Sequence, residues 1–337
     1  MSKGIPTREF AFAKSRAPAP FLLGVNYPWR NYGRDFGCVG SEHTGVSLPD
    51  SRGIVARDFA EIRQTGASTV RWFLFGDGRG GFVAEKGIAR KPDQFLLADV
   101  AAVLELAERN HLQLCLSLID FLWLQEHQGK RPPHPNEHAL HFASGREAFL
   151  QNVLIPLFRE FRSHPSLFAW EIANEPEWAI REFHRSRATR MSFSDFRAYA
   201  AEIARAVHEY AEVPVTLGSA RLMWVRAWTE IGLDLYQAHY YPRAERWKRR
   251  NLAQQLAILP TLDRPLWLAE LPAQDPFYPE YSLPQALDSC RNAGLCGAAI
   301  WRWTEPDPQG TDEALGRIDP DLLRAWSVPG GADERSA

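Results

Sequence analysis

Eight short apolar, β-rich runs recur along the 337-residue chain, separated by longer amphipathic segments. The runs are FLLGVNY (21–27), STVRWFLF (68–75), LQLCLSLI (112–119), SLFAWEIAN (166–174), VPVTLGSA (213–220), LDLYQAHYY (233–241), PLWLAEL (265–271) and CGAAIWRW (296–303). Strands that alternate with helices predict a parallel sheet of βαβ units, and eight units are the number that a closed barrel needs. No GxGxxG follows the first run, so a dinucleotide-binding fold has no support. We therefore expect an α/β protein with a (β/α)8 TIM barrel.

The segments between the runs carry apolar residues at three- and four-residue spacing, which is typical of amphipathic helices. Helices are expected at 55–67, 95–110, 146–163 and 192–211. Ser194 and Asp195 are candidates for the N-terminal cap of the last one. A single barrel domain accounts for residues 20–328, between an N-terminal extension (1–19) and a flexible tail (329–337).

The connections that follow the runs are long and irregular, whereas those that enter them are short. The long connections are 28–53, 76–94, 120–145 and 272–281. In a barrel, the loops after the strands form the face that carries the chemistry. Functional side chains are therefore expected at the C-terminal ends of the strands.

Two glutamates occupy such positions. Glu175 follows the fourth run in WEIANEPEW, and Glu270 lies near the end of the seventh in PLWLAEL. Cleavage of a glycosidic bond needs one carboxylic acid to protonate the leaving oxygen and a second carboxylate to meet the positive charge at the anomeric carbon. The pair of Glu175 and Glu270 therefore predicts a glycoside hydrolase.

With these motifs the chain resembles the clan A glycoside hydrolases, in particular glycoside hydrolase family 5, the cellulase and mannanase family, over residues 20–326. The resemblance implies that Asn174 binds the sugar 2-hydroxyl beside the acid/base Glu175, and that Glu270 is the nucleophile. It also implies an arginine on the second strand, a His-x-Tyr on the sixth and a tryptophan floor at the end of the eighth. The matching residues are Arg71, His239, Tyr241 and either Trp301 or Trp303. Chemistry of this type needs no cofactor or metal, and none is expected.

Charge and hydrogen bonding predict different roles for the two glutamates. Arg71 and the Tyr241 hydroxyl near Glu270 would favour its ionised form, whereas Glu175, facing another carboxylate, would hold a proton longer, so opposite pKa shifts are expected. Carboxyl groups about 5–5.5 Å apart, as the clan places them, lead to retention of anomeric configuration, and a separation beyond about 6.5 Å leads to inversion. The alternative for Arg71 is an internal salt bridge with Glu171.

The third and first strands add three candidates. Where the family's third strand often ends in a histidine that holds the sugar, LSLIDFLW offers Asp120, as a hydroxyl acceptor or as a cap of the loop. This departure puts the usual contacts to a 1,4-linked glucan in doubt. In GVNYPW, Asn26 and Trp29 are candidates for hydroxyl binding and sugar stacking, and a turn role is the alternative for Asn26.

The 12 tryptophans sort by position. Those at or just beyond strand ends suit stacking on pyranose rings, with packing under a loop as the alternative for about half of them. They are Trp29, Trp72, Trp123, Trp178, Trp224, Trp301 and Trp303. Trp170, Trp267 and Trp326 fall within strands or a helix and are expected in the core.

Other classes of site find little support. The net charge is −2, and the basic cluster around Trp247 suits a solvated helix start, so no nucleic-acid partner is predicted. That cluster consists of Arg246, Lys248, Arg249 and Arg250. The spacing of four histidines in the loop after the third run matches no zinc pattern, and no GxSxG elbow indicates a serine hydrolase. These histidines are His127, His134, His138 and His141.

Cysteines and apolar runs bear on the compartment. The four cysteines form no CxxC pair, so free thiols are expected, with a Cys290–Cys296 bridge as the alternative. No run of about 18 apolar residues predicts a membrane span. The first residues lack the apolar stretch of a signal peptide, so the chain as written is expected to be cytoplasmic, or secreted if a leader has been removed.

The expected function is a retaining O-glycoside hydrolase that acts on β-linked oligosaccharides or polysaccharides. Exo-action is favoured, because a protein without a leader would meet imported oligosaccharides. The long loops after the first and third strands could close one end of the cleft, as exo-action needs, or equally could extend it. An endo-β-1,4-glucanase or endo-β-mannanase is the alternative within this class. A catalytically silent carbohydrate-binding barrel and a metal-dependent barrel enzyme are the alternatives outside it. No sequence feature indicates an oligomeric state.

Overall fold

The computed structural model describes residues 21–126, 134–184, 191–245, 250–305 and 313–327. Eight parallel strands close into a barrel in the order β1-β12-β11-β10-β9-β8-β7-β4, and β1 pairs with both β12 and β4. The strands are β1 (Leu22–Asn26), β4 (Thr69–Phe73), β7 (Gln113–Asp120), β8 (Leu167–Asn174), β9 (Val215–Ser219), β10 (Tyr236–His239), β11 (Leu266–Pro272) and β12 (Gly297–Trp301). Each falls on one of the eight predicted runs, so the expected (β/α)8 barrel is confirmed.

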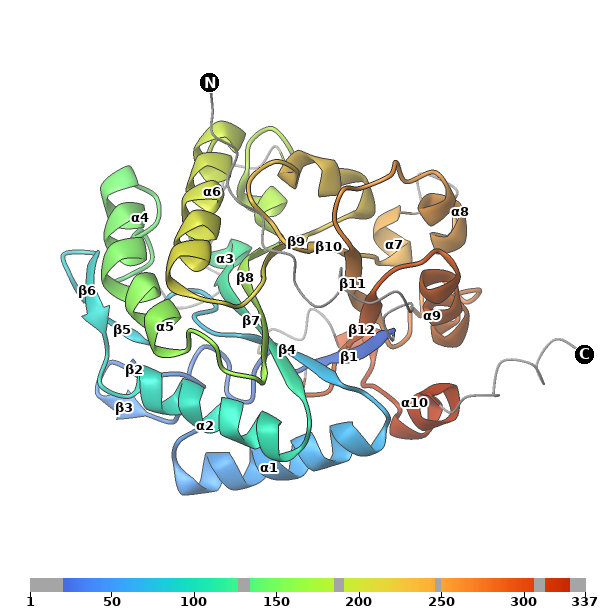
Figure 1. Cartoon of the computed structure of the whole chain (residues 1–337), viewed down its shortest axis with the longest axis horizontal. Coiled ribbons are helices and arrows are strands. Elements are labelled where there is room, and N and C mark those ends of the chain that lie inside the picture. Colours follow the sequence, from blue (N-terminus) through green and yellow to red (C-terminus); the bar gives the residue numbers. More distant parts are fainter. Residues whose placement is uncertain (1–20, 127–133, 185–190, 246–249, 306–312, 328–337) are drawn as a thin grey trace, which may run out of the picture.

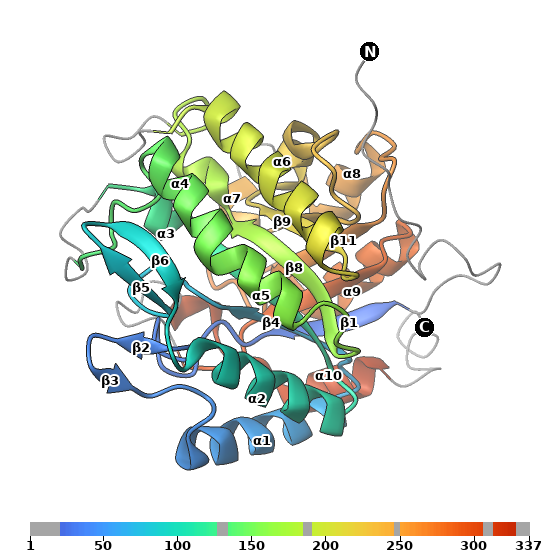
Figure 2. The ribbon, with the colours of Figure 1, turned by 60° about the vertical axis from the view of Figure 1, so that its left-hand side comes forward.

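Helices surround the barrel, and α1 and α2 lie side by side along one flank of it (Figures 1 and 2). The helices outside the loops are α1 (Pro49–Gln64), α2 (Leu96–Arg109), α4 (Ala143–Phe149), α5 (Ile155–Glu160), α6 (Phe193–Tyr210), α8 (Leu252–Ala257), α9 (Leu283–Asn292) and α10 (Pro320–Ser327). The loops after the strands contain α3 (Phe121–Leu124), α7 (Pro242–Glu245), the 3-10 turns η3 (Pro176–Ala179), η4 (Leu222–Trp228) and η6 (Glu313–Leu315), and the hairpins β2 (Cys38–Val39) with β3 (Glu42–His43) and β5 (Phe82–Glu85) with β6 (Ile88–Pro92).

Two helical segments differ from the prediction. The cap of α6 is Ser192, whose hydroxyl accepts the backbone N–H of Asp195 at 3.1 Å, two residues before the predicted cap. The single helix expected at 146–163 is interrupted by the π-helical turn η2 (Leu150–Leu154) between α4 and α5. Pro156 has no N–H to donate, so the regular hydrogen-bond ladder cannot continue through this point.

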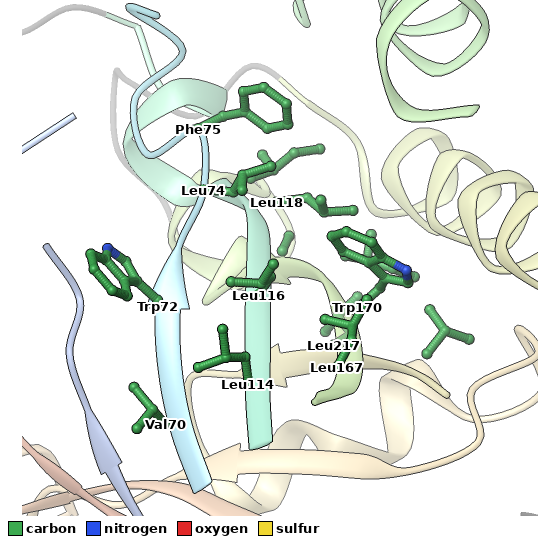
Figure 3. Packing of buried hydrophobic residues seen from close by; sticks show 14 of the residues in the cluster. Val70, Trp72, Leu74, Phe75, Leu114, Leu116, Leu118, Leu167, Trp170 and Leu217 are labelled. Atoms are coloured by element: carbon green, nitrogen blue, oxygen red, sulfur yellow. The ribbon is translucent and has the colours of Figure 1, made fainter. Parts of the chain in front are cut away.

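The main core lies between the barrel and its helices. Figure 3 shows Leu114, Leu116 and Leu118 of β7 packed in this layer. Because alternate residues of a strand point to opposite faces, Cys115 faces the barrel interior, where it belongs to a second apolar cluster with Trp267. The tryptophans predicted to be structural, Trp170, Trp267 and Trp326, are all buried.

Buried carboxylates fix the loop that follows β1. Asp35 accepts two backbone N–H groups of this loop at 2.7 Å each and the indole N–H of Trp72 in β4 at 3.0 Å. Asp99 of α2 accepts the backbone N–H groups of Gly37 and Ser47. The loop that carries Trp29 is therefore tied both to the barrel and to a helix.

Several predictions concern residues that the structure does not describe. The extension (1–19), the tail (329–337), His127 and the basic residues Arg246, Lys248 and Arg249 lie outside the described ranges, and the domain boundaries stay predictions. None of the helices in the described ranges is both long and apolar enough to cross a bilayer. Cys290 and Cys296 are free thiols and form no bridge.

Candidate active site

The two predicted catalytic glutamates meet at the C-terminal mouth of the barrel. Glu175 directly follows β8 in a left-handed backbone conformation with φ +47°, and its N–H donates to the carbonyl of Gly218 in β9 at 2.7 Å. Glu270 belongs to β11. One carboxylate oxygen of each lies within 4.8 Å of the other. This spacing suits direct attack by a carboxylate, whereas inverting enzymes keep about 6.5–9.5 Å between the two groups to admit a water molecule.

Arg71 of β4 is the central cation of the site, and it is fully buried. Its Nε and Nη2 donate to the two oxygens of Glu171 at 2.6 Å each, and its Nη1 donates to Glu270 Oε1 at 2.6 Å. Burial alone would lower the pKa of Arg71, but the charges of Glu171 and Glu270 raise it above its usual value. Arg71 therefore combines the predicted contact to Glu270 with the salt bridge to Glu171 that was its alternative.

Glu270 is surrounded by groups that favour its carboxylate form. The Tyr241 hydroxyl donates to Glu270 Oε2 at 2.5 Å, and His239 Nδ1 lies 3.5 Å from Oε1. Burial raises the pKa of Glu270, and His239, Arg71 and the Tyr241 hydrogen bond act in the opposite direction. The predicted nucleophile is thus a buried carboxylate with a donor on each oxygen.

Glu175 has weaker support for its charge. Its Oε2 accepts the indole N–H of Trp178 at 2.7 Å, and its Oε1 lies 2.8 Å from His239 Nδ1. Burial raises the pKa of Glu175 to about 7, although the Trp178 hydrogen bond and Arg71 lower it. The predicted rise in the pKa of Glu175 is confirmed, whereas the predicted fall at Glu270 is wrong, because burial raises the pKa of both carboxyl groups. Glu175 is nevertheless poised to hold a proton near neutral pH, as a general acid must.

His239 of β10 lies between the two carboxyl groups and is completely buried. Burial lowers its pKa to about 4, so the imidazole is neutral at neutral pH. A neutral ring at this position can share a proton with Glu175 without adding a second cation beside Arg71.

Asp120 orients Asn174 and caps the loop that follows β7. Asp120 Oδ1 accepts the backbone N–H of Leu122 at 2.8 Å and so caps α3, and its Oδ2 accepts from Asn174 Nδ2 at 2.7 Å. Arg71 Nη2 donates to Asn174 Oδ1 at 2.7 Å. The Asn174 amide is therefore held at both ends, and one N–H of Nδ2 stays free for a substrate hydroxyl. The cap that was the alternative role for Asp120 is confirmed, and its role as a hydroxyl acceptor stays a prediction.

Two other predicted substrate contacts are structural. Asn26 is fully buried, its Nδ2 donates to the carbonyls of Ala269 and Ile300, and its Oδ1 accepts from Arg71 at 2.9 Å. Trp123 is fully buried under the loops, where its indole N–H donates to the carbonyl of Asn136 at 3.0 Å. Neither side chain has a surface to offer to a sugar, so both predictions are wrong.

The remaining tryptophans divide between the mouth of the barrel and the core. The rings of Trp301 and Trp29 meet edge-to-face with their centroids 5.9 Å apart, and Trp301 also lies beside Phe73. The guanidinium of Arg71 lies 5.0 Å from the ring centroid of Phe73. Trp303 belongs to the main core, so Trp301 is the better candidate for the floor under the reacting sugar. Trp72 is also a core residue.

Trp178 and Trp224 lie on the other side of Glu175. Their ring centroids are 5.6 Å apart, and both rings are partly exposed. Sequence reasoning missed the nearby Arg221 and Glu177, although Arg221 lies just beyond the end of β9, the kind of position that supplied the other candidates.

Among the described residues, three side chains of this site form a group that could hold a metal ion. Glu175, His239 and Glu270 each offer one ligand atom within 4.8 Å of the other two. The oxygen of Glu270 that faces His239 already accepts a hydrogen bond from the Arg71 guanidinium, and a divalent cation beside this buried positive charge would be repelled. The donor set therefore suits proton transfer better than metal binding.

Comparison with known proteins agrees with this geometry. No family model matches the sequence. The mannan endo-1,4-β-mannosidase of Cryptopygus antarcticus is 28% identical over 169 residues, which are 48% of this chain and 39% of that protein. The enzyme of the same name from Mytilus edulis is 26% identical over 163 residues, 48% of this chain and 41% of that protein. The matches thus span less than half the length of these relatives.

Solved structures agree with the fold over a larger part of the chain. The endo-1,4-β-mannanase of Eisenia fetida superposes with a TM-score of 0.69 and 19% identity, over 91% of this chain and 95% of that one. The β-1,4-D-mannanase of Cryptopygus antarcticus gives 0.71 and 19%, over 91% and 89%. At such low identity the likeness concerns the fold alone. In its barrel and in the order of its strand-end motifs, the chain resembles the clan A glycoside hydrolases of family 5.

Proposed function

We propose that the protein is a retaining glycoside hydrolase that cleaves β-1,4-linked mannan or its oligosaccharides. The single observation that carries this proposal is the pair of carboxyl groups at the barrel mouth, with one oxygen of each within 4.8 Å of the other, Arg71 and Tyr241 on Glu270, and a pKa of about 7 at Glu175. The mannan substrate is suggested by the names of the two sequence relatives.

The reaction takes two steps. In the first, a Glu270 oxygen attacks the anomeric carbon, the bond from this carbon to the leaving oxygen breaks, and the proton of Glu175 passes to that oxygen. In the second, Glu175 takes a proton from water, whose oxygen attacks the anomeric carbon and releases Glu270 as a carboxylate. Two displacements at one carbon leave its configuration unchanged.

We infer endo-action in place of the exo-action expected from the sequence. The relatives are named endo-acting enzymes, and the exo-action inference depended on the start of the chain and on loop lengths alone. An endo-β-1,4-glucanase is the alternative that shares the same catalytic pair.

Product analysis tests the proposal. The protein is incubated with β-1,4-mannan, β-1,4-glucan and β-1,4-xylan, and viscosity, oligosaccharide products and the first anomer formed are followed. The expected result is a rapid fall in the viscosity of mannan with release of β-anomeric manno-oligosaccharides. Release of small sugars at constant viscosity would contradict endo-action, α-anomers would contradict retention, and binding without products would favour the silent carbohydrate-binding barrel.

The pH dependence of kcat/KM on a neutral manno-oligosaccharide is expected to fall above about pH 7. Glu175 must carry a proton to assist the leaving group, and burial raises its pKa to about 7. On the acid side, kcat/KM falls as Glu270 becomes protonated and loses its nucleophilic form. Steady-state rates from pH 4 to 9 measure both limbs, and persistence of the basic limb in a Glu175→Ala variant would contradict the assignment.

Replacement of Asp120 by alanine is expected to lower kcat/KM on β-1,4-mannotetraose roughly 10-fold. The Asn174 amide would lose the acceptor that fixes its orientation, and a buried donor without a partner costs about 1–3 kcal/mol. The exposed Asp50→Ala provides the matched control. Unchanged kinetics in a variant that melts like the wild type would show that Asp120 only caps α3.

A further inference from the structure

A cation and two indole rings adjoin the acid/base on the side away from Trp301. Arg221 connects β9 to η4, and its guanidinium lies 5.4 Å from the ring centroid of Trp178 and 4.8 Å from that of Trp224. The side chain is only 16% exposed, and Glu245 approaches its Nε at 3.6 Å. A guanidinium over aromatic rings is attracted by their negative faces, and more strongly in such a partly desolvated place than at an exposed one.

We propose that Arg221 is a positioning residue for the acid/base, acting through Trp178, whose indole N–H donates to Glu175 Oε2 at 2.7 Å. The guanidinium holds the plane of the Trp178 ring, and the ring holds one oxygen of Glu175. The other oxygen, Oε1, then lies 2.8 Å from His239 Nδ1 and is the one left to carry the transferable proton. The role of Glu175 as acid/base rests on the proposed function, whereas the contacts of Arg221 and Trp178 do not depend on it.

A buried carboxylate joins the two segments that carry these residues. Glu177 accepts the Ser219 hydroxyl at 2.6 Å, the Ala220 backbone N–H at 3.1 Å and the Trp228 indole N–H at 2.7 Å. The turn that carries Trp178 and the segment that carries Arg221 are therefore fastened to each other next to the contact. Because Glu177 joins their backbone segments, Arg221 and Trp178 are held at a fixed position relative to each other.

The charge of Arg221 also lowers the pKa of Glu175, in the same direction as the Trp178 hydrogen bond. The titratable and charged groups that face Glu175 are Arg71 of β4, Asp120 of β7, Glu171 of β8, His239 of β10, Tyr241, Glu270 of β11 and Arg221. Loss of Arg221 or of the indole N–H would consequently make Glu175 a weaker acid.

The experiment follows the indole N–H resonance of Trp178 in the 15N-tryptophan-labelled protein, assigned by its loss in Trp178→Phe. In the wild type this resonance is expected to titrate with a midpoint near pH 7 and to stop titrating in Glu175→Gln. In Arg221→Met the midpoint is expected to rise by roughly 0.5 pH unit. Arg221→Lys, which keeps the charge without the planar stack, is expected to shift it less, and the exposed Arg226→Met of the same turn not at all.

Kinetics provide the second readout. In Arg221→Met and Trp178→Phe, kcat/KM is expected to fall roughly 10-fold on phenyl β-mannobioside and to stay unchanged on the 2,4-dinitrophenyl substrate, whose leaving group needs no acid. A Trp178 resonance that does not titrate, or a midpoint unmoved in both Arg221 variants, overturns the inference. The titration needs no substrate, so an Arg221-dependent midpoint in a protein that hydrolyses no mannan would contradict the proposed function and leave the positioning role standing.

Discussion

Replacement of Glu270 by alanine is expected to lower kcat on β-1,4-mannotetraose at least about 10,000-fold, because no other carboxylate can form the covalent intermediate. Glu171 is the nearest substitute, but both of its oxygens are bonded to Arg71 inside the barrel. Azide fits the space left by the side chain and is expected to restore turnover of 2,4-dinitrophenyl β-mannobioside. The product should be the glycosyl azide of inverted configuration, identified by NMR.

The exposed Glu280→Ala, in the loop that follows β11, is the matched control and should behave as the wild type. Removal of Glu270 also leaves Arg71 with one carboxylate partner fewer, so the melting temperature is measured in parallel. Substantial activity of a folded Glu270→Ala variant without azide would refute the nucleophile assignment.

Replacement of Glu175 by alanine is expected to separate substrates by their leaving groups. On phenyl β-mannobioside, kcat/KM should fall roughly 100- to 10,000-fold, since the phenolate then leaves without a proton. On the 2,4-dinitrophenyl substrate the first step should be almost unaffected and the second slow, so the covalent intermediate accumulates and is visible by mass spectrometry. Azide should now give the product of retained configuration, opposite to that from Glu270→Ala.

Glu160→Ala, an exposed glutamate of α5, serves as the control for this variant. An equal loss on both substrates would show that Glu175 is not the acid. The two azide products together assign each glutamate without reference to any relative.

The barrel was predictable because its signal is periodic and repeated eight times. Each strand run is bounded by an amphipathic segment, so an error of a few residues at an end, as at the start of α1, leaves the topology intact. Glu175 and Glu270 were predictable for the same reason, because the C-terminal ends of all the parallel strands lie on one face of the barrel.

Contacts between side chains from different strands were not predictable in this way. In the sequence, Asn26 and Trp123 occupy the same kind of position, at or just beyond a strand end, as the two predicted catalytic glutamates. In the structure, neighbouring residues bury both side chains completely. Whether a strand-end residue is open to substrate depends on which loops fold over it, and single-strand patterns carry no such information. Asp120 illustrates the same point, because its role follows from Asn174, a residue 54 positions away.

In the proposed reaction, the arrangement around Arg71 limits how far charge moves. With Glu175 protonated, the buried group of Arg71, Glu171, Glu270 and Glu175 carries one net negative charge. When Glu270 becomes an ester and Glu175 gives up its proton, the total is the same, and the negative charge has only been relocated over less than 4.8 Å, past a neutral His239. The barrel interior never has to accommodate an additional ion, so its fixed dipoles can serve the resting enzyme and the intermediate alike with little reorganisation.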